Sequence, residues 1–124
     1  MSTRLGGQGG AIVNMSSMAA KLGGSNESTD YATAKGAIDT LTIGLAKELA
    51  TEGIRVNAVR PGLIDTDIQR DFGIGDRVAK YKHLVPMQRG GMAEEVAEVV
   101  MWLCSEKSSY CTGLLVDVAG GRGL

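Results

Sequence analysis

The chain has 124 residues, of which 44% are hydrophobic and 22% charged, with a net charge of −1 at pH 7. This length and composition fit one modest globular domain with a single core. The near-neutral charge and an aromatic content of only 4% argue against nucleic acid or an anionic membrane as a partner.

The first predicted element is a strand that ends at Ser17. The apolar run Ala11–Val13 follows a glycine cluster and is typical of a buried strand. Residues 18–30 are small and polar, which predicts a loop. A helix over residues 31–52 follows, with Asp30 as its N-cap and Gly53 as its left-handed C-cap residue. Its apolar residues recur at three- and four-residue steps: Ile38, Leu41, Leu45 and Leu49.

The second half of the chain repeats this alternation. Residues 54–59 alternate and are rich in β-branched side chains, which predicts a strand that Pro61-Gly62 stops. Residues 63–92 are weakly periodic, and we expect one or two short helices there. A helix then begins at the acidic pair Glu94-Glu95, without a strong cap, and residues 114–118 form a buried strand. Three strands alternating with two main helices predict an α/β fold with a mainly parallel sheet.

Ser17, Tyr31 and Lys35 are the residues that suggest chemistry. Tyr31 and Lys35 are four apart at the start of a helix, so they share one face. A tyrosine hydroxyl is a weak acid at neutral pH, and an ammonium group about 4 Å away stabilises the phenolate by about 4 kcal/mol at an effective dielectric of about 20. Ser17 ends the preceding strand, at the sheet edge where ligands bind in open α/β folds. The three predict proton transfer to or from a substrate oxygen. Taken alone, Tyr-x-x-x-Lys is also common by chance.

Four segments in order make the pattern specific. In this order and spacing they resemble the second half of the short-chain dehydrogenase/reductase family, and the resemblance is loosest over residues 66–92. It implies the C-terminal half of a doubly wound, Rossmann-like parallel sheet. The segments are Gly-Ala-Ile-Val-Asn-Met-Ser-Ser (10–17), Asp-Tyr-Ala-Thr-Ala-Lys-Gly-Ala (30–37), Gly-Ile-Arg-Val-Asn-Ala-Val-Arg-Pro-Gly (53–62) and Thr-Gly-Leu-Leu-Val-Asp-Val-Ala-Gly-Gly (112–121).

The resemblance implies a role for each catalytic residue. Tyr31 would be the acid/base, Lys35 would assist it and hold the nicotinamide-ribose hydroxyls, and Ser17 would polarise the substrate oxygen. Ser16 is a rival for the serine role, although the spacing to Tyr31 favours Ser17.

The resemblance also implies a nicotinamide site. Pro61, Gly62 and the backbone near Ile64 would line it, and Thr66 would lie close to the carboxamide or phosphate. As alternatives, Pro61-Gly62 is a strand terminator and Thr66 a helix cap. The cofactor would be NAD or NADP, and the residue that selects between them is not present in the sequence.

The family's phosphate-binding glycine turn has no counterpart in the sequence. The cluster Gly6–Gly10 precedes a strand, whereas such a turn follows one and opens a helix. We therefore expect residues 1–124 to be the catalytic and substrate half, with the dinucleotide-binding half and its catalytic asparagine absent. Such a half would expose the edge of the 11–14 strand and an apolar flank, which favours self-association.

Two functions remain open. The first is NAD(P)-dependent interconversion of a small-molecule secondary alcohol and a ketone, by an enzyme that is expected to be a homo-oligomer. The second is a truncated, non-catalytic fragment that only self-associates. Without an apolar signal segment, and with two cysteines that make no disulfide framework, we expect a cytoplasmic protein.

Three further residues carry weaker expectations. The single histidine, His83, has no metal-ligand cluster around it in the sequence, so we expect no metal site. Met87 lies where the family shapes its substrate pocket, which indicates a lid. Trp102 is expected in the core or in an interface.

Overall fold

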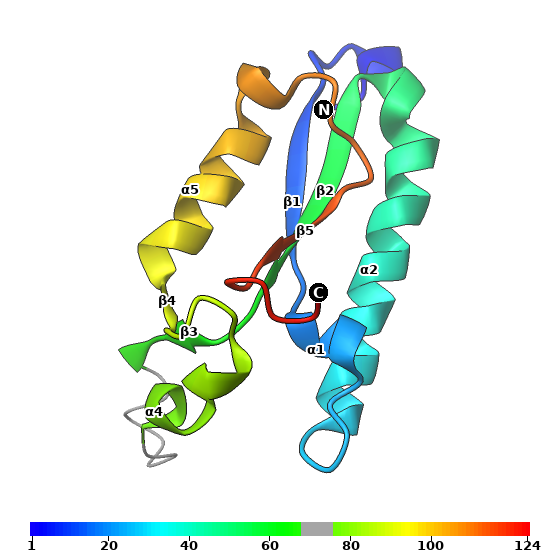
Figure 1. Cartoon of the computed structure of the whole chain (residues 1–124). Coiled ribbons are helices and arrows are strands. Elements are labelled where there is room, and N and C mark those ends of the chain that lie inside the picture. Colours follow the sequence, from blue (N-terminus) through cyan, green and yellow to red (C-terminus); the bar gives the residue numbers. More distant parts are fainter. Residues whose placement is uncertain (68–75) are drawn as a thin grey trace.

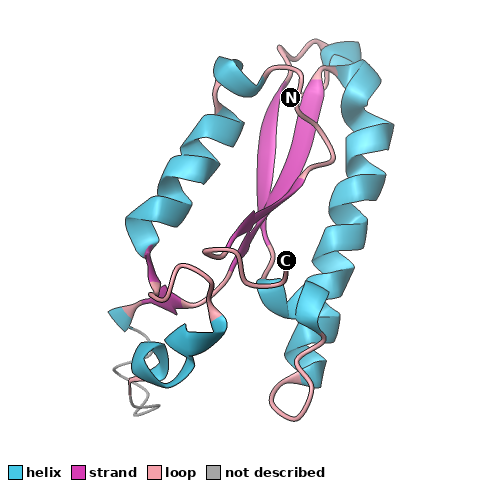
Figure 2. Ribbon diagram, viewed as in Figure 1, coloured by secondary structure: helices cyan, strands magenta, loops and turns pink. Residues whose placement is uncertain are grey.

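The computed structural model describes residues 1–67 and 76–124. Its main sheet has three parallel strands in the order β1-β2-β5, formed by β1 (Gly10–Met15), β2 (Ile54–Pro61) and β5 (Leu115–Val118). The long helices α2 (Thr29–Leu49) and α5 (Ala93–Cys104) flank this sheet on opposite sides (Figure 1). The predicted α/β class, with three parallel strands and two main helices, is confirmed (Figure 2).

β2 is the central strand of the sheet. It pairs with β1 from Gly10 opposite Ile54, and with β5 from Ala58 opposite Leu115. β2 is therefore largely buried, whereas β1 and β5 are only half-buried. The prediction that both outer strands are buried is wrong, because an outer strand of the described sheet has a neighbour on one side only.

Two apolar clusters hold the helices against the sheet. On the α2 face, Val56 packs with Ala46 and Ile54. On the α5 face, Val59 packs with Leu103. Because successive side chains of a strand point to opposite faces, one strand supplies both clusters. Burying an aliphatic side chain of this size stabilises the fold by about 1.5–3 kcal/mol.

The ends of α2 differ partly from those predicted. The helix begins at Thr29, and Asp30 lies within its first turn, so the N-cap prediction for Asp30 is wrong. A carboxylate there still interacts favourably with the helix dipole. A 3-10 turn, Ala50–Glu52, extends the helix to Gly53, which adopts the left-handed conformation (φ 72°) and donates its N–H to Ala50 O. The predicted C-cap is confirmed.

β2 extends two residues beyond the predicted 54–59 and ends at Pro61, so the prediction that Pro61-Gly62 stops the strand is confirmed. The N–H groups that point toward β5 belong to alternate residues: Ala58 donates to Leu114 O and Gly62 donates to Val118 O. Pro61 lies out of phase with them, so its missing N–H removes no hydrogen bond to β5. The strand therefore runs through Pro61.

Several short elements complete the described chain. α1 (Met18–Leu22) lies within residues 18–30, which were predicted to be a loop, so that prediction is wrong over α1. β3 (Ile64–Asp65) pairs in parallel with β4 (Gly91–Met92). α4 (Arg77–Tyr81) confirms a short helix in the 63–92 region, of which residues 68–75 lie outside the described chain.

α5 has more support at its start than the sequence indicated. The Glu95 side chain accepts a hydrogen bond of 2.8 Å from the Met92 N–H, which is one half of a capping box. In residues 1–67 and 76–124, no helix combines the length and apolar character needed to cross a bilayer.

Candidate active site

The carboxyl end of β1 presents two adjacent serines in different surroundings. Ser16 is buried, and its hydroxyl donates to Lys35 O at 3.2 Å. Ser17 is half-buried and is the N-cap of α1, where its Oγ accepts from the Ala19 N–H at 3.1 Å. That bond uses a lone pair and leaves the Ser17 hydroxyl proton free to donate. The geometry therefore gives Ser16 a structural role and leaves the Ser17 hydroxyl able to donate to another molecule.

Tyr31 and Lys35 lie on successive turns at the start of α2. The Lys35 Nζ is 5.7 Å from the centroid of the Tyr31 ring. The same ammonium donates to Met15 O at 2.8 Å, so it bridges the helix and the end of β1. The Tyr31 side chain remains open, with 48% of the residue exposed. This arrangement holds a positive charge beside an accessible tyrosine.

Three of the residues predicted for a nicotinamide site line one cavity, whereas Gly62 and Lys35 are not among its lining residues. Pro61, Ile64 and Thr66 line it together with Met15 and the α5 residue Val96. Its volume is about 490 Å³, within the range of small-molecule sites, and its lining is almost entirely apolar. Ile64 is buried in the α5 core, which leaves its backbone as the part able to meet a ligand. The lining comes mostly from α5, so the cavity favours an apolar ligand surface.

Gly62 permits a close approach between the ends of β2 and β5. A Cβ atom at Gly62 would lie 2.7 Å from the Ala119 Cβ, closer than real side chains allow. The Gly62 N–H donates to Val118 O at 3.0 Å. Gly62 is thus needed for packing, in addition to its predicted place in the site. The alternative role of Thr66 as a helix cap concerns residues 68–75, which lie outside the described chain.

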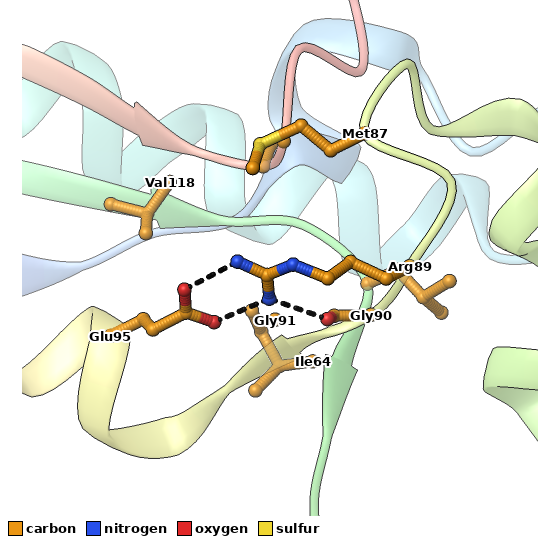
Figure 3. A pocket seen from close by; sticks show the side chains of 10 residues that line it. Ile64, Met87, Arg89, Gly90, Gly91, Glu95 and Val118 are labelled. Atoms are coloured by element: carbon orange, nitrogen blue, oxygen red, sulfur yellow. Dashed lines mark hydrogen bonds and ion pairs between the residues drawn. The ribbon is translucent and has the colours of Figure 1, made fainter.

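A second, smaller cavity lies on the other side of β3. Met87, Arg89 and Glu95 line it with Val118, and its volume is about 160 Å³ (Figure 3). The Arg89 guanidinium binds both carboxylate oxygens of Glu95, at 2.7 and 2.8 Å. The ion pair joins the segment after α4 to the start of α5, and we assign it an anchoring role. The lid role of Met87 stays a prediction.

The Arg89–Glu95 pair gives the stability of the fold a dependence on pH. The hydrogen bond from Arg89 lowers the pKa of Glu95 from 4.5 to about 2. A lowered pKa means that the stabilisation is complete above the unfolded value and is lost as the pH falls toward the folded value. We expect Glu95→Gln to lower the urea midpoint at pH 7, and we expect this difference from the native chain to shrink between about pH 4.5 and pH 2.

Both partners are largely solvated, so the effect is small. Glu94→Gln removes a carboxylate from the same helical turn and serves as the control. If the difference in urea midpoint between Glu95→Gln and the native chain stays constant from neutral to acidic pH, the anchoring role of the Arg89–Glu95 pair is contradicted.

The described residues offer little for metal or disulfide chemistry. Among residues 1–67 and 76–124, no group of three His, Cys, Asp or Glu side chains could hold a metal ion. Cys104 and Cys111 are both free. Trp102 is 40% exposed, so it is outside the core, and its place in an interface stays a prediction.

Comparison with known proteins decides the family. A family model described as "Enoyl-(Acyl carrier protein) reductase" matches residues 2–122. The uncharacterised oxidoreductase YgfF of Escherichia coli is 56% identical over 98% of this chain. A solved short-chain type dehydrogenase/reductase from Mycobacterium ulcerans superposes with a TM-score of 0.82 at 35% identity, over 93% of this chain and 42% of its own. The chain belongs to the short-chain dehydrogenase/reductase family.

Other members of this family extend the match. The 3-oxoacyl-[acyl-carrier-protein] reductase FabG of Aquifex aeolicus is 44% identical over 90% of this chain. A putative 2-deoxy-d-gluconate 3-dehydrogenase from Agrobacterium tumefaciens, solved with bound NADP, has a TM-score of 0.86 at 32% identity, over 95% of this chain and 48% of its own. The chain spans about half the length of the curated relatives it matches, 49% of YgfF and 44% of FabG.

Two groups at the candidate active site were not predicted from the sequence. The Met15 carbonyl, which holds the Lys35 ammonium, gives no side-chain signal in the sequence. Asp39 is buried within α2 and binds Arg60, the residue before Pro61. No signal in the sequence indicated Asp39, because the buried side of α2 carries Ala32, Thr42 and Ala46 with it, whereas Leu41 of the predicted apolar face is exposed.

Proposed function

We propose that this chain carries the proton-transfer part of an NAD(P)-dependent oxidoreductase that interconverts a secondary alcohol and a ketone. One observation carries the proposal: the Lys35 ammonium lies over the Tyr31 ring and is fixed there by Met15 O. A fixed cation beside an accessible phenol favours the phenolate that forms when Tyr31 gives up its proton. The family membership supports an oxidoreductase at the coarser level.

In the direction of reduction, Tyr31 donates its hydroxyl proton to the ketone oxygen, which becomes the alcohol hydroxyl. The Lys35 charge stabilises the phenolate that remains. Ser17 donates a hydrogen bond to the same substrate oxygen and so orients it. In the direction of oxidation, the phenolate accepts the alcohol proton.

A bound nicotinamide cofactor would exchange the hydride with the substrate carbon. Pro61, Gly62, the Ile64 backbone and Thr66 are the residues we propose to hold its nicotinamide end, because three of them line the apolar cavity. Lys35 and Tyr31 would contact the ribose. Binding of NADP by the Agrobacterium relative supports this class of cofactor.

The direct test is a titration of the purified chain with NADH and NADPH, followed by cofactor fluorescence. We expect saturable binding that Lys35→Ala weakens by about tenfold or more, since a charge-assisted hydrogen bond contributes about 1.5–3 kcal/mol. Lys47→Ala, an exposed lysine on the same helix, is the matched control and should bind like the native chain. An absence of binding at millimolar cofactor would refute the proposal for this chain.

The second candidate function, self-association without catalysis, is favoured by one surface. In the described chain β1 has a strand neighbour on one side only, and Met15 and Met101 are exposed beside the apolar cavity. An open strand edge next to apolar side chains favours pairing with another chain. Light scattering on the titration samples separates the two candidates: a multimer that binds no cofactor supports the second.

A further inference from the structure

We propose that Asp39 and Arg60 form a positioning pair, which aligns the Tyr31–Lys35 turn of α2 with the Pro61-Gly62 end of β2. This inference rests on the proposed function, because it assigns a task to residues that would not touch substrate. Asp39 follows Lys35 by one helical turn, and Arg60 directly precedes Pro61. The pair thus joins the two halves of the site next to the residues that would act.

The contact between them is specific. Arg60 Nε and Nη2 both donate to Asp39 Oδ2, at 3.0 and 2.7 Å. Asp39 is 7% exposed. The hydrogen bond to Asp39 raises the pKa of Arg60. Two donors on one oxygen fix the angle of the guanidinium as well as its distance.

The same arginine extends the connection to the other site elements. Arg60 Nη1 lies 3.5 Å from Asp117 Oδ1 on β5, and Asp117 Oδ2 binds Lys21 Nζ at 3.0 Å. Lys21 is in the last turn of α1, the helix that Ser17 caps. Asp117 precedes Val118, whose carbonyl receives the Gly62 N–H. One chain of charges therefore joins α2, β2, β5 and α1, the elements next to Lys35, Pro61 and Ser17.

The pair is poorly suited to serve stability alone. Asp39 Oδ1 is buried and accepts no hydrogen bond from the described residues. A buried carboxylate that accepts hydrogen bonds on only one oxygen does not recover the full free energy lost on removal from water. Apolar residues of similar size at such positions are often equally stable or more so. Orientation of the two elements is the property that an apolar pair would not reproduce.

The test separates stability from alignment with the double variant Asp39→Val/Arg60→Met, which removes both charges and keeps the bulk. Lys47→Met/Glu48→Gln removes one charge of each sign from the exposed side of α2 and is the matched control. We expect the melting temperature of the double variant to equal or exceed that of the native chain. We expect its kcat to fall by roughly 10- to 100-fold, since small misplacements of catalytic groups cost that much, with KM little changed.

Amide hydrogen exchange supplies a readout that does not depend on turnover. In the double variant, the Gly62 N–H should exchange at least about tenfold faster, because its partner Val118 O follows Asp117. The Val56 N–H donates to Thr112 Oγ1, and Val56 lies in the cluster on the α2 face of the sheet, so this N–H should keep its native exchange rate. Asp39→Asn, which keeps the side-chain shape, should show a smaller change in the same direction if the double variant does not fold.

The outcomes distinguish the two proposals. A native chain that neither binds cofactor nor turns over refutes the proposed function, and the Gly62 exchange rate then decides the positioning role alone. If the double variant keeps both the native kcat and the native Gly62 exchange, the positioning inference is overturned. A kcat that falls only in step with the melting temperature overturns it as well.

Discussion

Tyr31→Phe should lower kcat by about 10²- to 10⁴-fold, the range that a positioned general acid contributes. The substitution removes only the hydroxyl that gives and takes the proton. The ring remains, and with it the contact to the Lys35 ammonium at 5.7 Å from the centroid. Cofactor affinity, followed by NADPH fluorescence, should therefore stay within about threefold of the native value, a difference below about 1 kcal/mol.

Tyr110→Phe is the matched control for Tyr31→Phe. Tyr110 is fully exposed, and it lines a surface region that also contains Gly10 and Ile54, at the amino ends of β1 and β2. Tyr110→Phe should leave kcat and cofactor affinity unchanged. A Tyr31→Phe chain that keeps more than a tenth of the native turnover would exclude Tyr31 as the acid/base. Equal losses of turnover and affinity would assign it to binding instead.

Leu103→Ala should destabilise the fold by about 2–5 kcal/mol, the cost of removing a large aliphatic side chain from a packed core. Leu103 is fully buried and lies in the cluster with Val59, Ile64 and Val96 that joins α5 to the sheet. For a domain of marginal stability this is a large share of the total free energy of unfolding. Urea unfolding followed by circular dichroism measures the difference.

Met101→Ala tests the same helix at an exposed position. Met101 is 67% exposed, so its truncation should change the free energy of unfolding by no more than about 0.5 kcal/mol in a monomer. A larger loss that depends on protein concentration would show that Met101 is covered by a second chain. Equal losses in the Leu103 and Met101 variants would contradict the described packing of α5.

The main elements were predictable because their signals are local. The 3.6-residue period of α2 and α5 and the β-branched run of β2 identify these elements without knowledge of the fold. Gly53 was predictable for the same reason, because a helix often ends at a residue in the left-handed conformation, which glycine adopts without strain. Ser17, Tyr31 and Lys35 came from short-range spacing and from the family's ordered segments; their roles stay predictions.

What the sequence did not reveal depends on contacts between distant residues. The edge positions of β1 and β5 follow from strand order, which no single segment encodes. The different tasks of Ser16 and Ser17 depend on where α2 lies, since Lys35 O takes the Ser16 hydroxyl. Asp39 and Arg60 are far apart in sequence and meet only when α2 packs on β2. α1 was not predicted, because a helix of five residues shows no clear apolar period and its N-cap, Ser17, is also a candidate for chemistry.

The short pairing of β3 with β4 has a consequence for how this fold can vary. Ile64 lies opposite Gly91 and Asp65 opposite Met92, so the two ends of the 66–90 segment are held side by side. The segment therefore starts and ends at one place in the domain, and between these ends Val85 is buried and the Met87 N–H donates to Gly120 O. Lengthening such a closed loop is inexpensive, because each doubling of its length costs only about 0.6 kcal/mol of closure entropy. The length and sequence of this one segment can therefore change while the three-stranded sheet and its two flanking helices stay unaltered.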